Sequence, residues 1–174
     1  MDRIDDAMLA SLAQKLANKM GKAGQRLSVA ESCTGGWLAK ILTDLSGSSV
    51  WFDRGFVTYS NQSKNEMLGV SEATLEETGA VSQQTVEAMA EGALLNSNAD
   101  ISVAISGIAG PGGGTKDKPV GLVWFGWATS NPADKKHSMV NSISQQFSGN
   151  RDEVRRQAVA YALNGLLKQL TDLK

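Results

Sequence analysis

Two hydroxyls, a thiol and two glycines stand together in the segment Glu31-Ser32-Cys33-Thr34-Gly35-Gly36. Residues 27–31 before it are typical of a short strand, and the apolar positions from Trp37 onward recur at helical spacing. In open α/β sheets ligands bind beyond the carboxyl ends of the strands, where a helix start presents free N–H groups. Ser32 is therefore a candidate nucleophile for a carbonyl carbon. The candidate donors to the resulting oxyanion are the N–H groups of Thr34, Gly35 and Gly36.

Two other interpretations of this segment stay open. A serine or threonine before a helix commonly serves only as its N-cap. Cys33, the single cysteine, could be the nucleophile instead, although a lone cysteine is commonly an inert buried residue. A serine nucleophile also needs a base. The single histidine, His137, lies at the start of a polar strand; we interpret it as a surface residue, which disfavours a Ser-His-Asp triad.

A lysine can act as the base where burial lowers its pKa. The segment from Tyr59 to Lys64 follows a strand predicted over 50–59, so it also lies at an end of the sheet. Lys64 would hold the serine proton, and the hydroxyl of Tyr59 would relay or orient it. An exposed lysine on a short helix over 61–68 is the ordinary alternative, and spacing alone does not decide between them.

The glycine-rich tract from Ser106 to Thr115 follows a buried strand predicted over 101–105. Successive N–H groups in such a loop form an anion-binding concavity. The tract matches neither the Walker A pattern nor the dinucleotide fingerprint, so we predict a phosphate or ribose cradle of another kind. A flexible surface loop is the alternative. The predicted binding residues are Ser106, Gly107, Gly110 and Gly112.

Arg151 follows the segment Phe147-Ser148-Gly149-Asn150 and could reach a phosphate or carboxylate. The alternative is a solvent-exposed residue in the first turn of the last helix.

Composition limits the function classes. The chain has 174 residues, 41% of them hydrophobic, and a net charge of −1. We expect one domain, residues 1–174, with a small-molecule nucleotide rather than nucleic acid as its partner. The longest apolar run, residues 120–128, is too short to span a membrane, so we expect a cytoplasmic protein. One cysteine and one histidine make a zinc site improbable, and we expect no metal or other cofactor.

The remaining elements follow from periodicity. Helices are expected over 5–22, 37–45, 61–68, 72–78 and 83–95 and from 151 onward. Strands are expected over 27–31, 50–59 with a bulge at Gly55, 101–105, 120–128 and 136–147. The last two strands should pair antiparallel, with 136–147 at an edge. This order predicts the α/β class, with helices packed on both faces of a mixed sheet. The apolar stripes and four tryptophans leave room for a homodimer interface.

Five ordered blocks resemble one known family, the C-terminal domain of the CinA proteins. They are AESCTGG (30–36), Tyr59-Ser60-Asn61 with Lys64, Gly79-Ala80-Val81-Ser82, Ser106–Gly113 and Phe147–Arg151, within roughly residues 8–168. The chain is similar to the stand-alone form of this family, the nicotinamide mononucleotide deamidases. The resemblance implies a three-layer α/β/α sandwich with a mixed, mostly parallel sheet. It also implies hydrolysis of nicotinamide mononucleotide to nicotinate mononucleotide and ammonia, in pyridine nucleotide recycling. The implied catalytic residues are Ser32, Tyr59 and Lys64.

Two further hypotheses stand beside this one. A non-catalytic nucleotide-binding module would use the same cradle without turnover. An amidase could also act on another pyridine or pyrimidine nucleotide. An ammonia-release assay across nicotinamide compounds would separate all three.

Overall fold

The computed structural model describes the backbone over residues 4–131 and 134–172, and side chains over 4–131 and 138–170. Five strands form one sheet in the order β2-β1-β3-β4-β5. Strand β1 pairs in parallel with β2 and β3, whereas β4 is antiparallel to both β3 and β5. All strands except β4 therefore point the same way, which confirms the mixed, mostly parallel sheet. The strands are β1 Leu27–Glu31, β2 Phe52–Val57, β3 Ile101–Gly107, β4 Leu122–Asn131 and β5 Asp134–Gln146.

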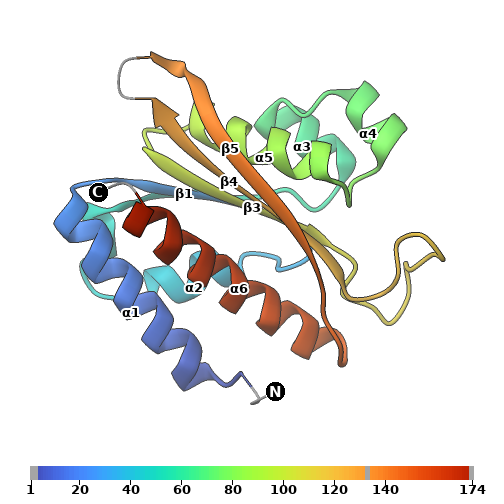
Figure 1. The fold of residues 1–174 in the computed structure, drawn as a ribbon, viewed down its shortest axis with the longest axis horizontal. Helices are drawn as coiled ribbons and strands as arrows, with labels where there is room; N and C mark the ends of the chain where they lie inside the picture. The colour runs from blue at the N-terminus through green and yellow to red at the C-terminus, as the bar shows by residue number, and fades with distance from the viewer. Residues whose placement is uncertain (1–3, 132–133, 173–174) are drawn as a thin grey trace.

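Helices cover both faces of this sheet, as predicted (Figure 1). One layer holds α1 Asp6–Ala23, α2 Trp37–Thr43 and α6 Arg151–Asp172, and the other holds α3 Asn61–Leu68, α4 Glu72–Thr78 and α5 Gln83–Leu95. A short 3-10 helix spans Ser48–Val50. Each layer buries its own apolar cluster against the sheet. In the described part of the chain, none of the helices has the length and apolar character needed to cross a membrane.

The two faces of the sheet are filled differently because side chains alternate along each strand. On the face toward α6, β3 contributes Val103 and Ile105 to a core of large side chains. On the face toward α5 it contributes Ala104, and the hydroxyl of Ser102 donates to the carbonyl of Ala90 at 2.7 Å. Small side chains on this face let α5 lie close to the sheet. This packing holds the strands whose ends lead into the segments of the candidate site.

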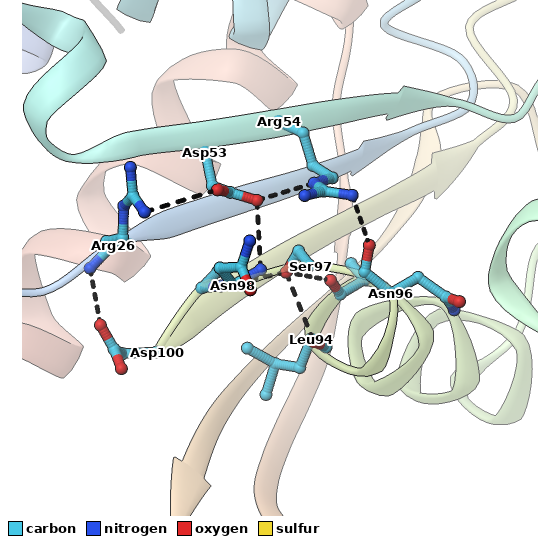
Figure 2. Close-up of polar contacts among 10 residues, drawn as sticks. Arg26, Asp53, Arg54, Leu94, Asn96, Ser97, Asn98 and Asp100 are labelled. Atoms are coloured by element: carbon cyan, nitrogen blue, oxygen red, sulfur yellow. Dashed lines mark hydrogen bonds and ion pairs between the residues drawn. The ribbon is translucent and has the colours of Figure 1, made fainter.

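A polar network closes the end of the sheet where β1, β2 and β3 begin (Figure 2). One oxygen of the Asp53 carboxylate accepts from Arg54 Nε at 2.7 Å and from the N–H of Asn98 at 3.2 Å. Its other oxygen lies 3.9 Å from an Arg26 nitrogen. The N–H of Arg26 in turn donates to Asp100 at 2.8 Å. These contacts tie β2 to the connection between α5 and β3, and they lie away from the site segments.

The bulge predicted at Gly55 was wrong. The register of β1 and β2 shifts between the pairs Leu27–Phe52 and Ser28–Arg54, so the extra residue is Asp53. Gly55 pairs regularly with Val29. A Cβ atom there would lie 3.1 Å from the Cβ of Ala39, so this glycine serves the close approach of α2.

Most element boundaries agree with the periodicity. The helices over 61–68, 72–78 and 83–95 and the strand over 27–31 are confirmed. The strand predicted over 50–59 is shorter because the 3-10 helix occupies its first position. The polar strand at 136–147 is confirmed as an edge strand antiparallel to its neighbour. The prediction that His137 is a surface residue lies outside the described side chains.

Candidate active site

Four segments meet at one edge of the sheet. Because β1, β2, β3 and β5 run the same way, their carboxyl ends lie at a common edge. The segments after them carry Ser32, Tyr59, the loop of residues 108–121 and Arg151 respectively. Figure 1 shows the 108–121 loop projecting past the sheet on the side where α6 begins. Sequence positions more than a hundred residues apart are thereby brought to one place.

The side chain of Lys64 contacts Ser32 at this edge. Lys64 Nζ donates to Ser32 Oγ at 3.1 Å, to the carbonyl of Thr58 at 2.8 Å and to that of Tyr59 at 3.3 Å. Ser60 caps α3 through Ser63 N–H, which places Lys64 near the start of the helix, facing inward. Lys64 has no exposed surface, and Ser32 is only 8% exposed. The surface-lysine alternative for Lys64 is therefore wrong.

Burial lowers the pKa of Lys64 from 10.5 to about 8, because the charged amine has lost its water. The thiol of Cys33 acts in the opposite direction, more weakly. An ammonium offers three protons to the three oxygens around it. A neutral amine would give two protons to the carbonyls of Thr58 and Tyr59 and turn its lone pair toward the Ser32 hydroxyl. The site can therefore hold the lysine in either protonation state.

The loop after Ser32 uses most of its N–H groups internally. The buried carboxylate of Glu31 accepts from the N–H groups of Gly36 and Leu38 at 3.1 Å and of Ala39 at 2.8 Å. The N–H of Gly35 donates to the carbonyl of Ser32 at 3.1 Å. Two of the three predicted oxyanion donors, Gly35 and Gly36, are therefore already engaged. Within the described residues, the N–H of Thr34 has no acceptor.

Glycine is needed at both engaged positions. Gly35 and Gly36 have φ values of 61° and 92°, the left-handed region that side chains rarely adopt. This backbone turns the chain back so that Glu31, rather than Ser32, caps α2. The prediction that Ser32 is a plain N-cap is therefore wrong, because its hydroxyl contacts Lys64 instead.

A cavity of about 260 Å³ opens beside Ser32. Among the predicted site residues it is lined by Ser32, Tyr59, Ser106, Gly107, Gly110, Gly112 and Arg151. The lining, as described, leaves out Thr34, Gly35 and Gly36. The structure therefore brings the serine, the tyrosine, the glycine loop and the arginine together around one space.

Arg151 and Tyr59 interact with each other across this space. Arg151 donates to the Tyr59 hydroxyl at 3.2 Å and to the carbonyl of Gly110 at 2.7 Å. The Tyr59 hydroxyl thus makes its hydrogen bond with Arg151 and not with Ser32 or Lys64. The backbone carbonyl of Tyr59, by contrast, accepts from the lysine.

Two other residues in the cavity wall, Ser106 and Cys33, carry a hydroxyl or a thiol. The hydroxyl of Ser106 donates to the carbonyl of Ala80 at 2.6 Å, which joins the end of β3 to the segment before α5. Burial raises the pKa of the Cys33 thiol to about 11, so the reactive thiolate is scarce near neutral pH. The Cys33 nucleophile alternative therefore loses support.

Several residues at the site are not among the site residues predicted from the sequence. Ala80 and Val81 line the cavity, and Glu31 holds the loop. Arg155 donates to the carbonyls of Cys33 and Thr34. Arg155 lies four positions after Arg151, on the same face of the helix, and that spacing was the available signal. A second signal in the sequence was Glu31, directly before the candidate nucleophile.

The fold and this site define a class: three-layer α/β proteins with a hydroxyl–amine pair at the carboxyl edge of a mostly parallel sheet. Comparison with known proteins places the chain more narrowly. The family model described as the CinA C-terminal domain matches residues 9–170, and the chain belongs to this family.

Three relatives show how close the likeness is. The chain is 51% identical over 166 residues to nicotinamide-nucleotide amidohydrolase PncC of Escherichia coli (strain K12), covering 94% of this chain and 96% of that protein. A solved CinA superfamily protein from Klebsiella pneumoniae has a TM-score of 0.86 at 36% identity, over 94% of this chain and 98% of that one. The competence/damage inducible protein CihA from Agrobacterium tumefaciens has a TM-score of 0.84 at 42% identity, over 98% and 99%. The predicted family and fold are confirmed.

Proposed function

We propose that this protein is a nicotinamide-nucleotide amidohydrolase that converts nicotinamide mononucleotide to nicotinate mononucleotide and ammonia, in pyridine nucleotide recycling. The observation that carries the proposal is the buried contact of 3.1 Å between Lys64 Nζ and Ser32 Oγ beside a cavity. The near full-length similarity to proteins named nicotinamide-nucleotide amidohydrolase supports the choice of substrate.

The first half of the reaction forms an acyl-enzyme. Neutral Lys64 removes the proton of Ser32 as its oxygen attacks the carboxamide carbon. Cys33 lines the cavity and, within the described residues, its N–H has no acceptor, so this N–H stabilises the negative charge that develops on the carboxamide oxygen. As the tetrahedral intermediate collapses, the C–N bond breaks, and Lys64 returns the proton to the departing nitrogen, so that ammonia leaves. The carbonyls of Thr58 and Tyr59 hold the lysine in both protonation states.

The second half is hydrolysis of the ester. Lys64, neutral again, removes a proton from water, which attacks the acyl carbon, and Ser32 leaves with that proton. The products are nicotinate mononucleotide and the regenerated enzyme. Every step in this scheme moves one proton between the lysine, the serine, water and the leaving group.

The nucleotide part of the substrate would be held by the other walls of the cavity. Arg151 brings a positive charge, and the glycine loop brings backbone groups, to the same space as Ser32. A phosphate bound there orients the carboxamide toward the nucleophile, which can supply much of the rate enhancement. We assign this role to Gly107, Gly110, Gly112 and Arg151, and to Tyr59 through its contact with Arg151.

The test is ammonia release from nicotinamide mononucleotide by the wild type and by Ser32→Ala. We expect the variant to lose at least about a thousandfold in kcat while its melting temperature stays close to that of the wild type. Ser28→Ala is the matched control, because it removes a buried hydroxyl from the strand that precedes Ser32, and that hydroxyl donates to the carbonyl of Ala93 instead. A Ser32→Ala variant that releases ammonia at the wild-type rate would refute the assignment of Ser32 as the nucleophile.

The same assay addresses the two other hypotheses. Thermal stabilisation of the wild type by the mononucleotide without ammonia release would favour a binding module of the same fold. If free nicotinamide, the dinucleotide or a pyrimidine nucleotide is turned over faster than the mononucleotide, that compound would replace the mononucleotide as the proposed substrate.

A further inference from the structure

The loop that follows Ser32 is held from outside the cavity by an arginine of α6. Arg155 Nε donates to the carbonyl of Cys33 at 3.0 Å, and a terminal nitrogen of the same guanidinium donates to the carbonyl of Thr34 at 2.9 Å. Arg155 is half-buried and, in the described structure, is not part of the cavity lining. It therefore contacts the loop without being placed to contact a bound substrate.

These two hydrogen bonds fix the orientation of the peptide units. The C=O and N–H of a trans peptide point in opposite directions, and the Cys33–Thr34 bond is trans. Because the carbonyl of Cys33 points at Arg155, the N–H of Thr34 points away from the α6 layer. The lysine comes from α3, on the opposite face of the sheet. The N–H of Thr34, which has no acceptor within the described residues, is thus turned away from the layer that holds it.

We propose that Arg155 is a positioning residue for the acyl-transfer reaction. By holding the carbonyls of Cys33 and Thr34, it keeps the loop that carries Ser32 and the N–H of Cys33 in place beside the cavity while Ser32 attacks. The inference rests on the proposed amidohydrolase function and adds a residue that acts on the transition state through the backbone. It also explains why the loop holds its shape although Gly35 and Gly36 favour flexibility.

An arginine suits this role better than a lysine. Its planar guanidinium presents several N–H donors in a fixed fork, which matches two successive carbonyls. Its positive charge also strengthens the donor character of the same peptide units, because hydrogen bonds in a chain polarise one another. The Trp37 ring, 5.4 Å from the guanidinium carbon, supports Arg155 from α2.

The neighbouring arginine supplies a matched control. Arg156 also lies over the Trp37 ring, at 4.9 Å, but its hydrogen bonds and ion pairs are with Asp6 and Asp152. Within the described residues, Arg156 makes no hydrogen bond or ion pair with the loop. Arg155→Gln and Arg156→Gln therefore remove the same kind of side chain from the same helix. Only Arg155→Gln also removes the contacts with the loop.

The experiment measures kcat and KM for ammonia release from nicotinamide mononucleotide, over a range of pH, for the wild type, Arg155→Gln, Arg155→Lys and Arg156→Gln. We expect Arg155→Gln to lower kcat by about ten- to a hundredfold with KM within about threefold, because the loop that carries the nucleophile is no longer held in place. Arg155→Lys should recover part of this loss. Arg156→Gln should keep kcat within about twofold. The pH midpoint should be the same in all four proteins, since Arg155 does not contact Lys64.

Each other outcome overturns the inference. Equal kcat values for Arg155→Gln and Arg156→Gln would show that the loop contacts are not needed. A loss confined to KM would make Arg155 a substrate contact, and a shifted pH midpoint would show that it acts on the base. If Arg155→Gln does not fold, the comparison rests on Arg155→Lys against Arg156→Lys. Absence of ammonia release by the wild type would instead refute the proposed function, and the inference with it.

Discussion

Arg151 Nη2 donates to the hydroxyl of Tyr59 at 3.2 Å, joining the first turn of α6 to the segment that follows β2. The same arginine also donates to the carbonyl of Gly110 in the glycine loop. Three walls of the cavity are therefore connected through one guanidinium. Tyr59 is 63% exposed, so its ring lies at the outer part of the cavity rather than beside the buried lysine.

Replacing Tyr59 with Phe tests what the hydroxyl does, because it leaves the ring and the backbone carbonyl in place. We expect kcat to stay within about twofold of the wild type and KM for the mononucleotide to rise several-fold, since Arg151 loses one partner that orients it. Steady-state ammonia release gives both constants. A fall in kcat of about tenfold or more at unchanged KM would contradict this expectation and restore a role in proton transfer.

The lowered pKa of Lys64 predicts how activity depends on pH. Only the neutral amine can accept the serine proton, and burial brings its pKa to about 8. We therefore expect kcat/KM to rise with pH and to level off above a midpoint near 8. Rates measured from about pH 6 to about pH 9.5 on folded enzyme would reveal the midpoint. A profile that is flat or falls through this range would exclude Lys64 as the base.

The same group links stability to pH. The folded protein releases the Lys64 proton near pH 8, whereas the unfolded chain keeps it up to about 10.5. Between these values the unfolded state binds more protons, so the free energy of unfolding rises with pH. The lysine's contribution is complete above 10.5 and is lost as the pH falls through about 8.

Lys64→Met removes this linkage. From pH 7 to pH 10, we expect the free energy of unfolding of the wild type to gain on the order of 2 kcal/mol relative to the variant. Urea unfolding of both proteins at several pH values measures the difference, in which the other titrating groups cancel. A constant difference across the range would show that the pKa of Lys64 is not lowered by folding.

The local parts of this structure could be predicted from the sequence, and the contacts between them only in part. Strand 27–31 and helix 61–68 follow from periodicity and from Ser60, which caps α3. Lys64 reaches Ser32 because β2 lies next to β1 and runs parallel to it. The spacing of residues along the chain does not determine this order of the strands. The residue pattern alone leaves the pairing of Ser32 with Lys64 open, and the family resemblance implies it.

The errors share a physical cause. Gly35 and Gly36 are predicted oxyanion donors because helix starts have free N–H groups, but the N–H of Gly36 donates to the Glu31 carboxylate and that of Gly35 to the carbonyl of Ser32. Arg155 is not among the predicted site residues, because its partners are backbone carbonyls 121 and 122 positions away. The side chains of Glu31 and Arg155 both bond to backbone groups, and the residue type at the partner position carries no signal for such a contact.

Cys33 offers a further test of the nucleophile. Its thiol is buried, and its pKa of about 11 leaves very little thiolate at neutral pH. We expect Cys33→Ala to keep kcat within about threefold of the wild type and iodoacetamide to leave the wild type active. Ammonia release by the variant, and by the wild type before and after iodoacetamide treatment, measures both effects. Loss of activity in the alanine variant, with folding unchanged by circular dichroism, would shift the nucleophile from Ser32 to Cys33.

The Asp53 network at the opposite end of the sheet predicts a stability effect separate from catalysis. Burial opposes ionisation of this carboxyl, but the Arg54 and Asn98 hydrogen bonds and the charges of Arg54 and Arg26 outweigh it, so its pKa lies below 3.8. Because the folded pKa is lowered, the carboxylate stabilises the fold at pH values above 3.8. This stabilisation is lost as the pH falls through the lower folded value.

Asp53→Asn should therefore lower the free energy of unfolding by about 1 to 2 kcal/mol at neutral pH, since charged hydrogen bonds become weaker neutral ones. The gap to the wild type should narrow as the pH is lowered toward about 3. Asp44→Asn is the control: its ion pair with Lys40 is largely exposed, so its effect should stay within about 0.5 kcal/mol. Because Asp53 lies away from the cavity, kcat should not change in either variant. Equal stabilities for the two variants at neutral pH would mean that the network in Figure 2 contributes no more than an ordinary surface pair.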